Sequence, residues 1–313
     1  MRVLVTGGTG MLGRNLRAAR GAAAHAILAP RRAELDLTRA DDCRRYVAEA
    51  RPDLVVHLAG RVGGIQANID RAALALSDNL LMGINVVTAA RAAGVPRLVN
   101  LGSSCMYPRD RAERLDVGQL LSGPLEPTNE AYALAKLSVW KLVEVIGHES
   151  PALCYRTLIA CNLYGPFDHF DPLSSHLVPA AILKIDQALE TGADTVEIWG
   201  DGAARREFMF AADLADFIWR FADRLDELPR TLNVGVGVDL SVDDYYARIA
   251  ALMGYAGGFA HNLRRPAGMR RKLLDVSAQE ALGWRPPTAL DDGLRRTLAH
   301  FAHAKAAGAI SAA

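Results

Sequence analysis

The chain has 313 residues, of which half are hydrophobic and 23% are charged, and its formal net charge is +1. This composition excludes a disordered chain, and the spread of its basic residues gives no electrostatic footprint for nucleic acid or an anionic membrane. The N-terminus reads as a strand that runs into glycines instead of a secretion signal, and no apolar run reaches the roughly 20 residues of a membrane-spanning helix. We therefore expect a cytoplasmic protein without a nucleic-acid or membrane partner.

Cysteine usage points to the same compartment. The four cysteines, at positions 43, 105, 154 and 161, contain no CxxC pair. Their spacing predicts neither disulfides nor a structural zinc site, so we expect no bound metal.

Residues 1–165 alternate short apolar runs with helical patterns. Strands that are short, almost wholly apolar and separated by helices indicate a parallel sheet covered on both faces, so this part predicts a doubly wound α/β (Rossmann) fold. The expected strands are 3–5, 26–28, 54–58, 98–101 and 153–158, and the expected helices are 12–19, 41–50, 80–93 and 132–146.

The rhythm changes after residue 165. We expect a nucleotide-binding domain over 1–165, rejoined by about 206–236, and a smaller, discontinuous substrate lobe built from 166–205 and 237–313. The elements expected in that lobe are a helix at 176–189, a strand at 196–199, a helix at 240–253, a strand near 259–263 and a last helix at 290–303.

A glycine-rich turn, TGGTGMLG at 6–13, follows the first expected strand and opens the first expected helix. Gly7, Gly10 and Gly13 let backbone N–H groups and the helix N-terminus approach a pyrophosphate, with Met11 and Leu12 on the same turn. A tight strand-to-helix connection is the alternative. The position directly after an N-terminal strand favours a dinucleotide site.

The type of dinucleotide depends on the residues after the second strand. An NAD enzyme would present a carboxylate there to the adenosine ribose, whereas this chain places Arg31 and Arg32. Two guanidiniums suit the 2′-phosphate of NADP, so NADP(H) is favoured. Glu34 and Asp36 lie close by as an alternative ribose acid, and a solvated loop is the plainer explanation of the arginine pair.

Tyr132 and Lys136 lie four residues apart on an expected helix, hence on one face. A nearby ammonium favours the phenolate, and we expect Lys136 to lower the pKa of Tyr132 toward the working range. The alternative is a surface tyrosine with a solvated lysine. Ser103, at the carboxyl end of the fourth expected strand, favours the catalytic interpretation because ligands of open α/β sheets bind at that edge.

Together the glycine turn, Ser103 and the Tyr132–Lys136 pair resemble the extended short-chain dehydrogenase/reductase family. Within it, the chain looks most similar to the epimerase-reductases of GDP-linked 4-keto-6-deoxy sugars, and the similarity covers most of its length. The stretches that carry this similarity are VGGI at 62–65, LGSSC at 101–105, LEPTNE at 125–130, NLYGP at 162–166, SH at 175–176, REF at 206–208 and RKLLDV at 271–276.

The resemblance implies a two-stage reaction. Carbons next to a ketone lose protons readily, and the family's cysteine and histidine, which exchange those protons on opposite sugar faces, match Cys105 and His176. NADPH then reduces the C4 carbonyl, with Tyr132 as proton donor, Ser103 bonded to the carbonyl oxygen and Lys136 on the nicotinamide ribose. Without the resemblance, Cys105 is equally a small buried hydrophobe, and His176 a helix-start residue bonded to a carbonyl.

Further positions are expected to hold the ligands. Asn162 and Leu163 would border the nicotinamide, and the remaining candidates would bind a diphosphate, sugar hydroxyls or the base of a GDP-linked keto sugar. Simple solvation of the lysines and a core role for the tryptophan are the alternatives. These substrate candidates are Lys184, Trp199, Arg206 and Lys272.

Two departures from the family pattern leave the sugar open. Cys161 stands where a threonine is usual, and Gly60-Arg61 where alanine and lysine are usual. A pocket altered in this way leaves a GDP-linked 6-deoxy-4-keto-heptose as an alternative substrate. The absence of a carboxylate beside Ser103 disfavours a dehydratase, and His57 and His169 are assigned to structure or solvent.

Two other classes stay in view. A plain C4 epimerase would not require Cys105 or His176, and a non-catalytic NADP-binding regulator would not need Ser103, Tyr132 and Lys136 intact. The helix around Tyr132 bears more apolar residues than one sheet-facing stripe needs. Pairing it with the helix at 79–93 in a second copy predicts a homodimer.

Overall fold

A six-stranded parallel sheet forms the centre of the chain. The computed structural model describes residues 1–109, 111, 113–171 and 174–310. The strand order is β10-β5-β4-β3-β1-β2, and every neighbouring pair is parallel. The strands are β1 (Arg2–Thr6), β2 (Ala26–Leu28), β3 (Leu54–His57), β4 (Arg97–Ser103), β5 (Cys154–Ala160) and β10 (Thr231–Val234).

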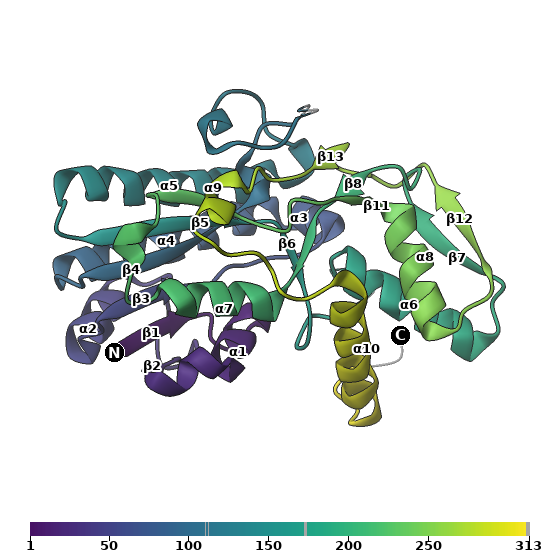
Figure 1. Cartoon of the computed structure of the whole chain (residues 1–313), viewed down its shortest axis with the longest axis horizontal. Coiled ribbons are helices and arrows are strands. Elements are labelled where there is room, and N and C mark those ends of the chain that lie inside the picture. Colours follow the sequence, from purple (N-terminus) through teal and green to yellow (C-terminus); the bar gives the residue numbers. More distant parts are fainter. Residues whose placement is uncertain (110, 112, 172–173, 311–313) are drawn as a thin grey trace.

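Both faces of this sheet are buried, which explains the apolar strands. Val3 and Val5 belong to one core cluster, whereas Leu4 between them belongs to another on the opposite face. The first cluster packs under α1 (Met11–Ala18) and α7 (Ala211–Phe221), and the second under α2 (Ala40–Ala50) and α4 (Ala72–Ala92). Helix α5 (Glu130–Glu149) contributes to both. The predicted doubly wound α/β fold is confirmed (Figure 1).

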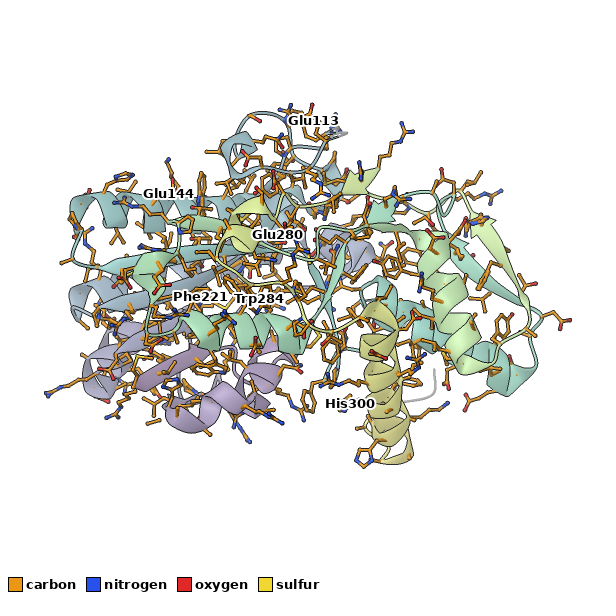
Figure 2. All side chains as sticks on the ribbon, viewed as in Figure 1. Glu113, Glu144, Phe221, Glu280, Trp284 and His300 are labelled. Atoms are coloured by element: carbon orange, nitrogen blue, oxygen red, sulfur yellow. The ribbon has the colours of Figure 1, made fainter. Side chains whose placement is uncertain are left out.

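Strand β10 and helix α7 come from late in the chain but pack against its first part. Helix α7 lies beside α1, and β10 pairs with β5. Trp284, which follows α9 (Ser277–Ala281), stacks its edge on Phe217 of α7, near Phe221 (Figure 2). The expected division into a cofactor domain and a discontinuous substrate lobe stays a prediction.

A separate core cluster lies beside the carboxyl ends of the strands. Its principal members are Ile182, Ile198, Tyr245, Ile249 and Phe301, all buried. The elements here are α6 (Leu177–Thr191), β7 (Thr195–Trp199), α8 (Val242–Met253), β12 (Gly258–Asn262) and α10 (Leu290–Ala306). Small pairings complete it: β11 (Leu240–Ser241), β8 (Arg205–Arg206) and β13 (Arg271–Lys272) form one sheet, and β6 (Asn162–Tyr164) pairs with β9 (Phe208–Phe210).

Helix α4 corrects one expectation drawn from the sequence. In the part of the chain that the structure describes, it alone is long and apolar enough, by length and composition, to cross a membrane. Its inner side packs on α2 and α5, which accounts for much of its apolar character. Its outer side leaves Leu74, Leu81 and Ile84 exposed.

Candidate active site

The glycine turn after β1 adopts a shape that side chains would prevent. Gly7 has φ +71°, and a Cβ there would lie 2.7 Å from the backbone N of Ala59. A Cβ on Gly13 would lie 2.3 Å from the carbonyl oxygen of Gly7. No side chain caps the N-terminus of α1, whose cap residue is Gly10, so its first N–H groups are available to an anion.

A cleft beside this turn fits a dinucleotide. Of the residues predicted to hold the cofactor, Gly7, Gly10 and Arg32 line it. The Arg32 side chain is 72% exposed and lies 3.7 Å from Asp36, which also lines the cleft. The predicted cofactor residues outside the cleft lining are Met11, Leu12, Gly13, Arg31, Lys136, Asn162 and Leu163. Leu12 is instead buried in the core, and Gly13 supports the turn.

The cleft also contains an ion pair that sequence reasoning did not foresee. Arg61 and Asp78 both line it, and the Arg61 guanidinium lies 2.7 Å from the Asp78 carboxylate. Asn79 fixes this loop, because its side chain accepts from the Arg61 N–H and donates to the Arg61 carbonyl. Only the position of Gly60-Arg61 in the sequence points to this role, because these residues follow β3 at the sheet edge where the glycine turn follows β1.

Helix α5 brings Tyr132 to the end of β4. Tyr132 is 8% exposed, and burial together with the charge of Cys105 raises the pKa of its phenol, against a hydrogen bond from Ser103 that lowers it. Lys136 donates from Nζ to the carbonyl of Leu101 at 2.8 Å, with Nζ 5.9 Å from the Tyr132 ring centroid. Burial lowers the pKa of Lys136 to about 8.

The expected lowering of the Tyr132 pKa by Lys136 is therefore not seen. The lysine's ammonium is directed to a backbone carbonyl, and burial dominates at both groups. The phenol stays protonated at neutral pH, which is the form that a proton donor needs.

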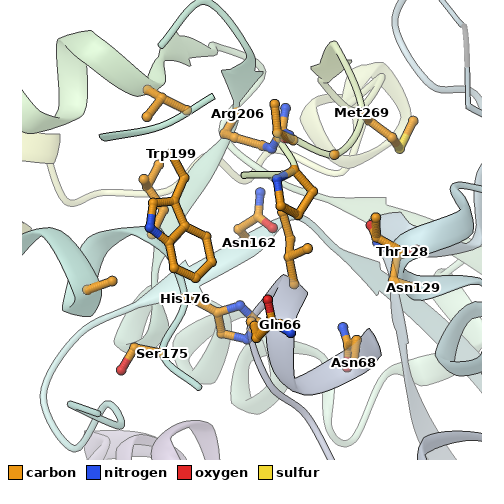
Figure 3. A pocket seen from close by; sticks show the side chains of 18 of the residues that line it. Gln66, Asn68, Thr128, Asn129, Asn162, Ser175, His176, Trp199, Arg206 and Met269 are labelled. Atoms are coloured by element: carbon orange, nitrogen blue, oxygen red, sulfur yellow. The ribbon is translucent and has the colours of Figure 1, made fainter. Parts of the chain in front are cut away.

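A second pocket lies between the strand ends and helix α6, and Figure 3 shows His176, Trp199 and Arg206 around it. Cys105 and Lys272 line it as well. Ser103 and Tyr132 are not in its lining. The backbone N–H of Cys105 donates to the Ser103 hydroxyl at 3.3 Å, and the Ser103 hydroxyl is hydrogen-bonded to Tyr132. Asn162 and Lys184 complete the predicted residues that border the pocket.

Cys105 and Lys272 form a contact across the pocket wall. The lysine Nζ donates to the thiol Sγ at 3.2 Å. Burial would raise the pKa of Cys105, but the charge of Lys272, hydrogen bonds from Ser103 and Lys272, and the charge of Arg206 outweigh it, so the pKa is lowered. These surroundings favour a thiolate.

His176 faces the same pocket from the start of α6. It precedes the helix without a side-chain cap bond, which leaves the imidazole directed at the pocket (Figure 3). Burial, then the charge of Lys272 and that of His169, lower its pKa to about 4, so the ring is neutral at pH 7.

The glycines of the VGGI segment position the chain before His176. Gly64 donates its N–H to the carbonyl of Ser174 at 2.8 Å, and a Cβ at Gly64 would lie 2.4 Å from the Ser175 oxygen. The VGGI motif is visible in the sequence, but its packing role depends on two segments that meet only in the fold. Gly64 thus sets where the imidazole can stand.

Cations surround Trp199 at the outer part of the pocket. Lys184 Nζ and the Arg265 guanidinium lie 5.2 and 4.8 Å from its ring centroid. The indole donates to Glu197 at 2.9 Å, and Lys184 donates to the Glu197 carbonyl. Arg206 bonds the carbonyl of Ala267, which shapes the rim.

Comparison with known proteins places this geometry in a family. The model of the NAD dependent epimerase/dehydratase family matches residues 3–235. The chain belongs to this family. Relatives match nearly the whole chain, so the resemblance to extended short-chain reductases that act on GDP-linked sugars is confirmed.

Two curated relatives and one solved structure define the neighbourhood. A GDP-L-colitose synthase from Yersinia pseudotuberculosis is 44% identical over 97% of this chain and 99% of its own length. A GDP-L-fucose synthase from Azorhizobium caulinodans is 47% identical over 96% of both chains. The solved GDP-D-glycero-L-gluco-heptose synthase from Campylobacter jejuni, crystallised in the presence of NADPH, has a TM-score of 0.86 at 25% identity and covers 96% of this chain and 98% of that one.

His57, His169 and Cys161 do not line either pocket, and their surroundings indicate structural roles. His57 is 2% exposed and lies 2.7 Å from the Thr6 hydroxyl, and burial followed by the charge of Lys136 lowers its pKa to about 3. His169 bonds the Ser174 hydroxyl at 2.9 Å. Burial raises the pKa of Cys161, so its thiol stays protonated.

Proposed function

We propose that this enzyme is an NADPH-dependent epimerase-reductase of a GDP-linked 4-keto-6-deoxy sugar. The observation that carries the proposal is that Cys105 and His176 line one pocket, while Ser103 is hydrogen-bonded both to Cys105 and to Tyr132. The printed names of its relatives, GDP-L-fucose synthase and GDP-L-colitose synthase, agree with a GDP-sugar.

Cys105 and His176 perform the epimerisation. The thiolate of Cys105 removes a proton from a carbon beside the ketone, and the electron pair of that C–H bond moves into the enolate. His176 returns a proton from the other side of the sugar. Negative charge on a bound diphosphate raises the pKa of His176 from its low value, which favours the imidazolium that can donate.

Tyr132 and Ser103 serve the reduction. NADPH, when bound, supplies hydride to the C4 carbonyl carbon. Tyr132 holds the proton for the developing alkoxide, because burial and the charge of Cys105 keep the phenol protonated, and Ser103 bonds the same oxygen. Lys136 lies one turn further along α5, where it would bind the nicotinamide ribose.

The cleft beside the glycine turn would hold NADP(H). Gly7, Gly10 and Gly13 form a cradle that a Cβ would fill or distort, and the exposed Arg32, which pairs with Asp36 at 3.7 Å, would turn to a 2′-phosphate. Asn162 would border the nicotinamide from the substrate side. Met11, Leu12 and Leu163 remain proposed cofactor neighbours, and the guanidinium of Arg31 remains proposed beside that of Arg32 for the 2′-phosphate.

The outer pocket would bind the nucleotide end of the substrate. Lys184 and Arg206 offer cations to a diphosphate, and Trp199 offers a ring face to the base. Lys272 stands at the inner end, beside Cys105, where a sugar hydroxyl or a phosphate oxygen is also within its reach.

A GDP-linked 6-deoxy-4-keto-heptose is the second candidate substrate, favoured by the likeness to the Campylobacter jejuni heptose synthase. Incubation with NADPH and either the hexose or the heptose keto-sugar nucleotide, followed by NMR of the product, decides between them. In the same assay Cys105→Ser should block deuterium uptake from solvent at C3 and C5 while reduction continues. Unchanged uptake in that variant would refute the epimerase role.

We also propose a soluble, cytoplasmic homodimer. Leu81 and Ile84 of α4 and Leu134 and Val145 of α5 are exposed apolar residues on neighbouring helices. Pairing of the α4 and α5 faces of two copies would cover them. Small-angle scattering that gave a monomer mass at micromolar concentration would reject the dimer.

A further inference from the structure

Lys272 is a buried cation whose nearest partner is a thiol. Lys272 is 7% exposed, and its Nζ lies 3.2 Å from Sγ of Cys105. Among the residues that the structure describes, no aspartate or glutamate forms an ion pair with it. A buried ammonium is costly unless an anion lies beside it, so Cys105 is the group positioned to supply that anion.

The strand that carries Lys272 fixes its direction. β13 pairs with β8 in the register Lys272 with Arg206 and Arg271 with Arg205. Alternation along the strand sends Arg271 to the carboxylate of Asp239, at 2.7 Å, and Lys272 to the opposite side, into the pocket. Two residues further on, Leu274 donates its N–H to the buried carboxylate of Glu207. Contacts on both sides therefore hold the lysine against Cys105.

We propose that Lys272 is a positioning residue that acts through Cys105: it holds the thiol as a thiolate, ready to remove a proton from the sugar. The effect of Lys272 on catalysis rests on the proposed function. The ionisation of the Cys105 thiol does not rest on it, because this ionisation is a property of the chain without substrate.

The charges around the pocket agree with this role. Around Cys105 stand Lys272 from β13, Arg206 from β8, Ser103 from β4 and the protonated phenol of Tyr132 from α5. Lys272 is the largest of the influences that lower the pKa of Cys105, and its charge also helps to keep His176 neutral.

The path of the proton through one catalytic cycle shows where Lys272 acts. When the thiolate takes a proton from carbon, an S–H bond forms, the C–H bond breaks and the negative charge moves to the enolate oxygen. Lys272 loses its counterion at that moment. Return of the thiol proton to solvent restores the pair, and the ammonium drives that return.

Alkylation of the free, full-length chain by iodoacetamide tests the thiolate directly. The rate at Cys105 is followed against pH by mass spectrometry of its peptide, in the wild type, Lys272→Met, Lys272→Arg and the exposed control Lys141→Met. We expect Lys272→Met to move the midpoint upward by about one pH unit and to lower the rate at neutral pH roughly three- to tenfold. Lys272→Arg should retain most of the wild-type midpoint, and Lys141→Met all of it.

The midpoint, not the absolute rate, decides the question, because the shorter, uncharged methionine side chain at 272 also changes access to the thiol. An unchanged midpoint in Lys272→Met, with circular dichroism showing a folded chain, overturns the proposal. A lysine that only held the diphosphate would give that outcome, together with a raised KM.

Catalysis supplies an independent measurement. With substrate, Lys272→Met should lower deuterium uptake at C3 and C5 at least tenfold, while NADPH oxidation with the already epimerised ketone changes only a few-fold. An equal loss in both reactions contradicts a role through Cys105. If the wild type takes up no deuterium, the proposed function fails, and the alkylation midpoint still decides the role of Lys272.

Discussion

Replacement of Glu207 by glutamine isolates one buried carboxylate that joins three segments. Oε1 accepts from the N–H groups of Val236 and Gly237 at 2.6 and 2.7 Å, and Oε2 accepts from Leu274 at 2.9 Å. An amide can keep its oxygen toward Val236 and Gly237, but its NH2 group then faces the N–H of Leu274. One charge-assisted bond is lost and a buried donor is left without an acceptor.

The expected cost follows from those bonds. Loss of a charge-assisted bond and of the partner of a buried N–H destabilises a fold by about 2–4 kcal/mol. An unfolding entropy of about 2.1 cal/mol/K per residue means that each kcal/mol changes the Tm of a 313-residue chain by roughly 1.5 °C, so Glu207→Gln should lower Tm by roughly 3–6 °C. Differential scanning calorimetry measures it, with the exposed Glu227→Gln as the matched control. A Tm within 1 °C of that control would refute the reasoning.

Three further predictions follow from single contacts. Tyr132→Phe should lower kcat for ketone reduction roughly 10²- to 10⁴-fold and leave the Kd for NADPH, measured by fluorescence titration, nearly unchanged, whereas retained turnover would remove the phenol from the mechanism. Arg32→Ala should weaken NADPH binding roughly 10- to 100-fold with little effect on NADH binding. Arg31 lies outside the cleft lining, so Arg31→Ala should change the ratio of the two Kd values less. Equal changes of this ratio in both variants would contradict the assignment. His57 has a folded-state pKa lowered from 6.5 to about 3, so the unfolded chain binds a proton that the fold excludes between these values. Stability should fall by about 1.4 kcal/mol per pH unit on acidification through this window, and urea titrations of His57→Asn should show a correspondingly shallower slope.

The sheet and the glycine turn could be predicted because their determinants are local. Apolar strands such as the one around Val55 must be buried on both faces, and only a parallel sheet between helix layers achieves this. Gly7 and Gly13 are required by steric contacts with their own neighbourhood. Such constraints act over a few residues and are readable in the sequence.

The partners of the charged groups could not be predicted in the same way. The spacing predicts that Lys136 acts on the phenol one helical turn away, but its ammonium meets the carbonyl of Leu101 on strand β4. Arg61 meets Asp78 because the loop after β3 packs against helix α4 in the fold. Lys272 reaches Cys105 across 167 residues of chain, a meeting that depends on the register of β13 with β8. Spacing along the chain carries no information on such encounters.

The distance along the chain between Cys105 and Lys272 has a consequence for biosynthesis. While the polypeptide grows, the thiol leaves the ribosome long before the lysine is translated, and until then it is an ordinary cysteine with an ordinary affinity for its proton. Only docking of the C-terminal segment turns it into a reactive anion. The fold thereby withholds its most nucleophilic atom from electrophiles until the pocket that shelters it is complete.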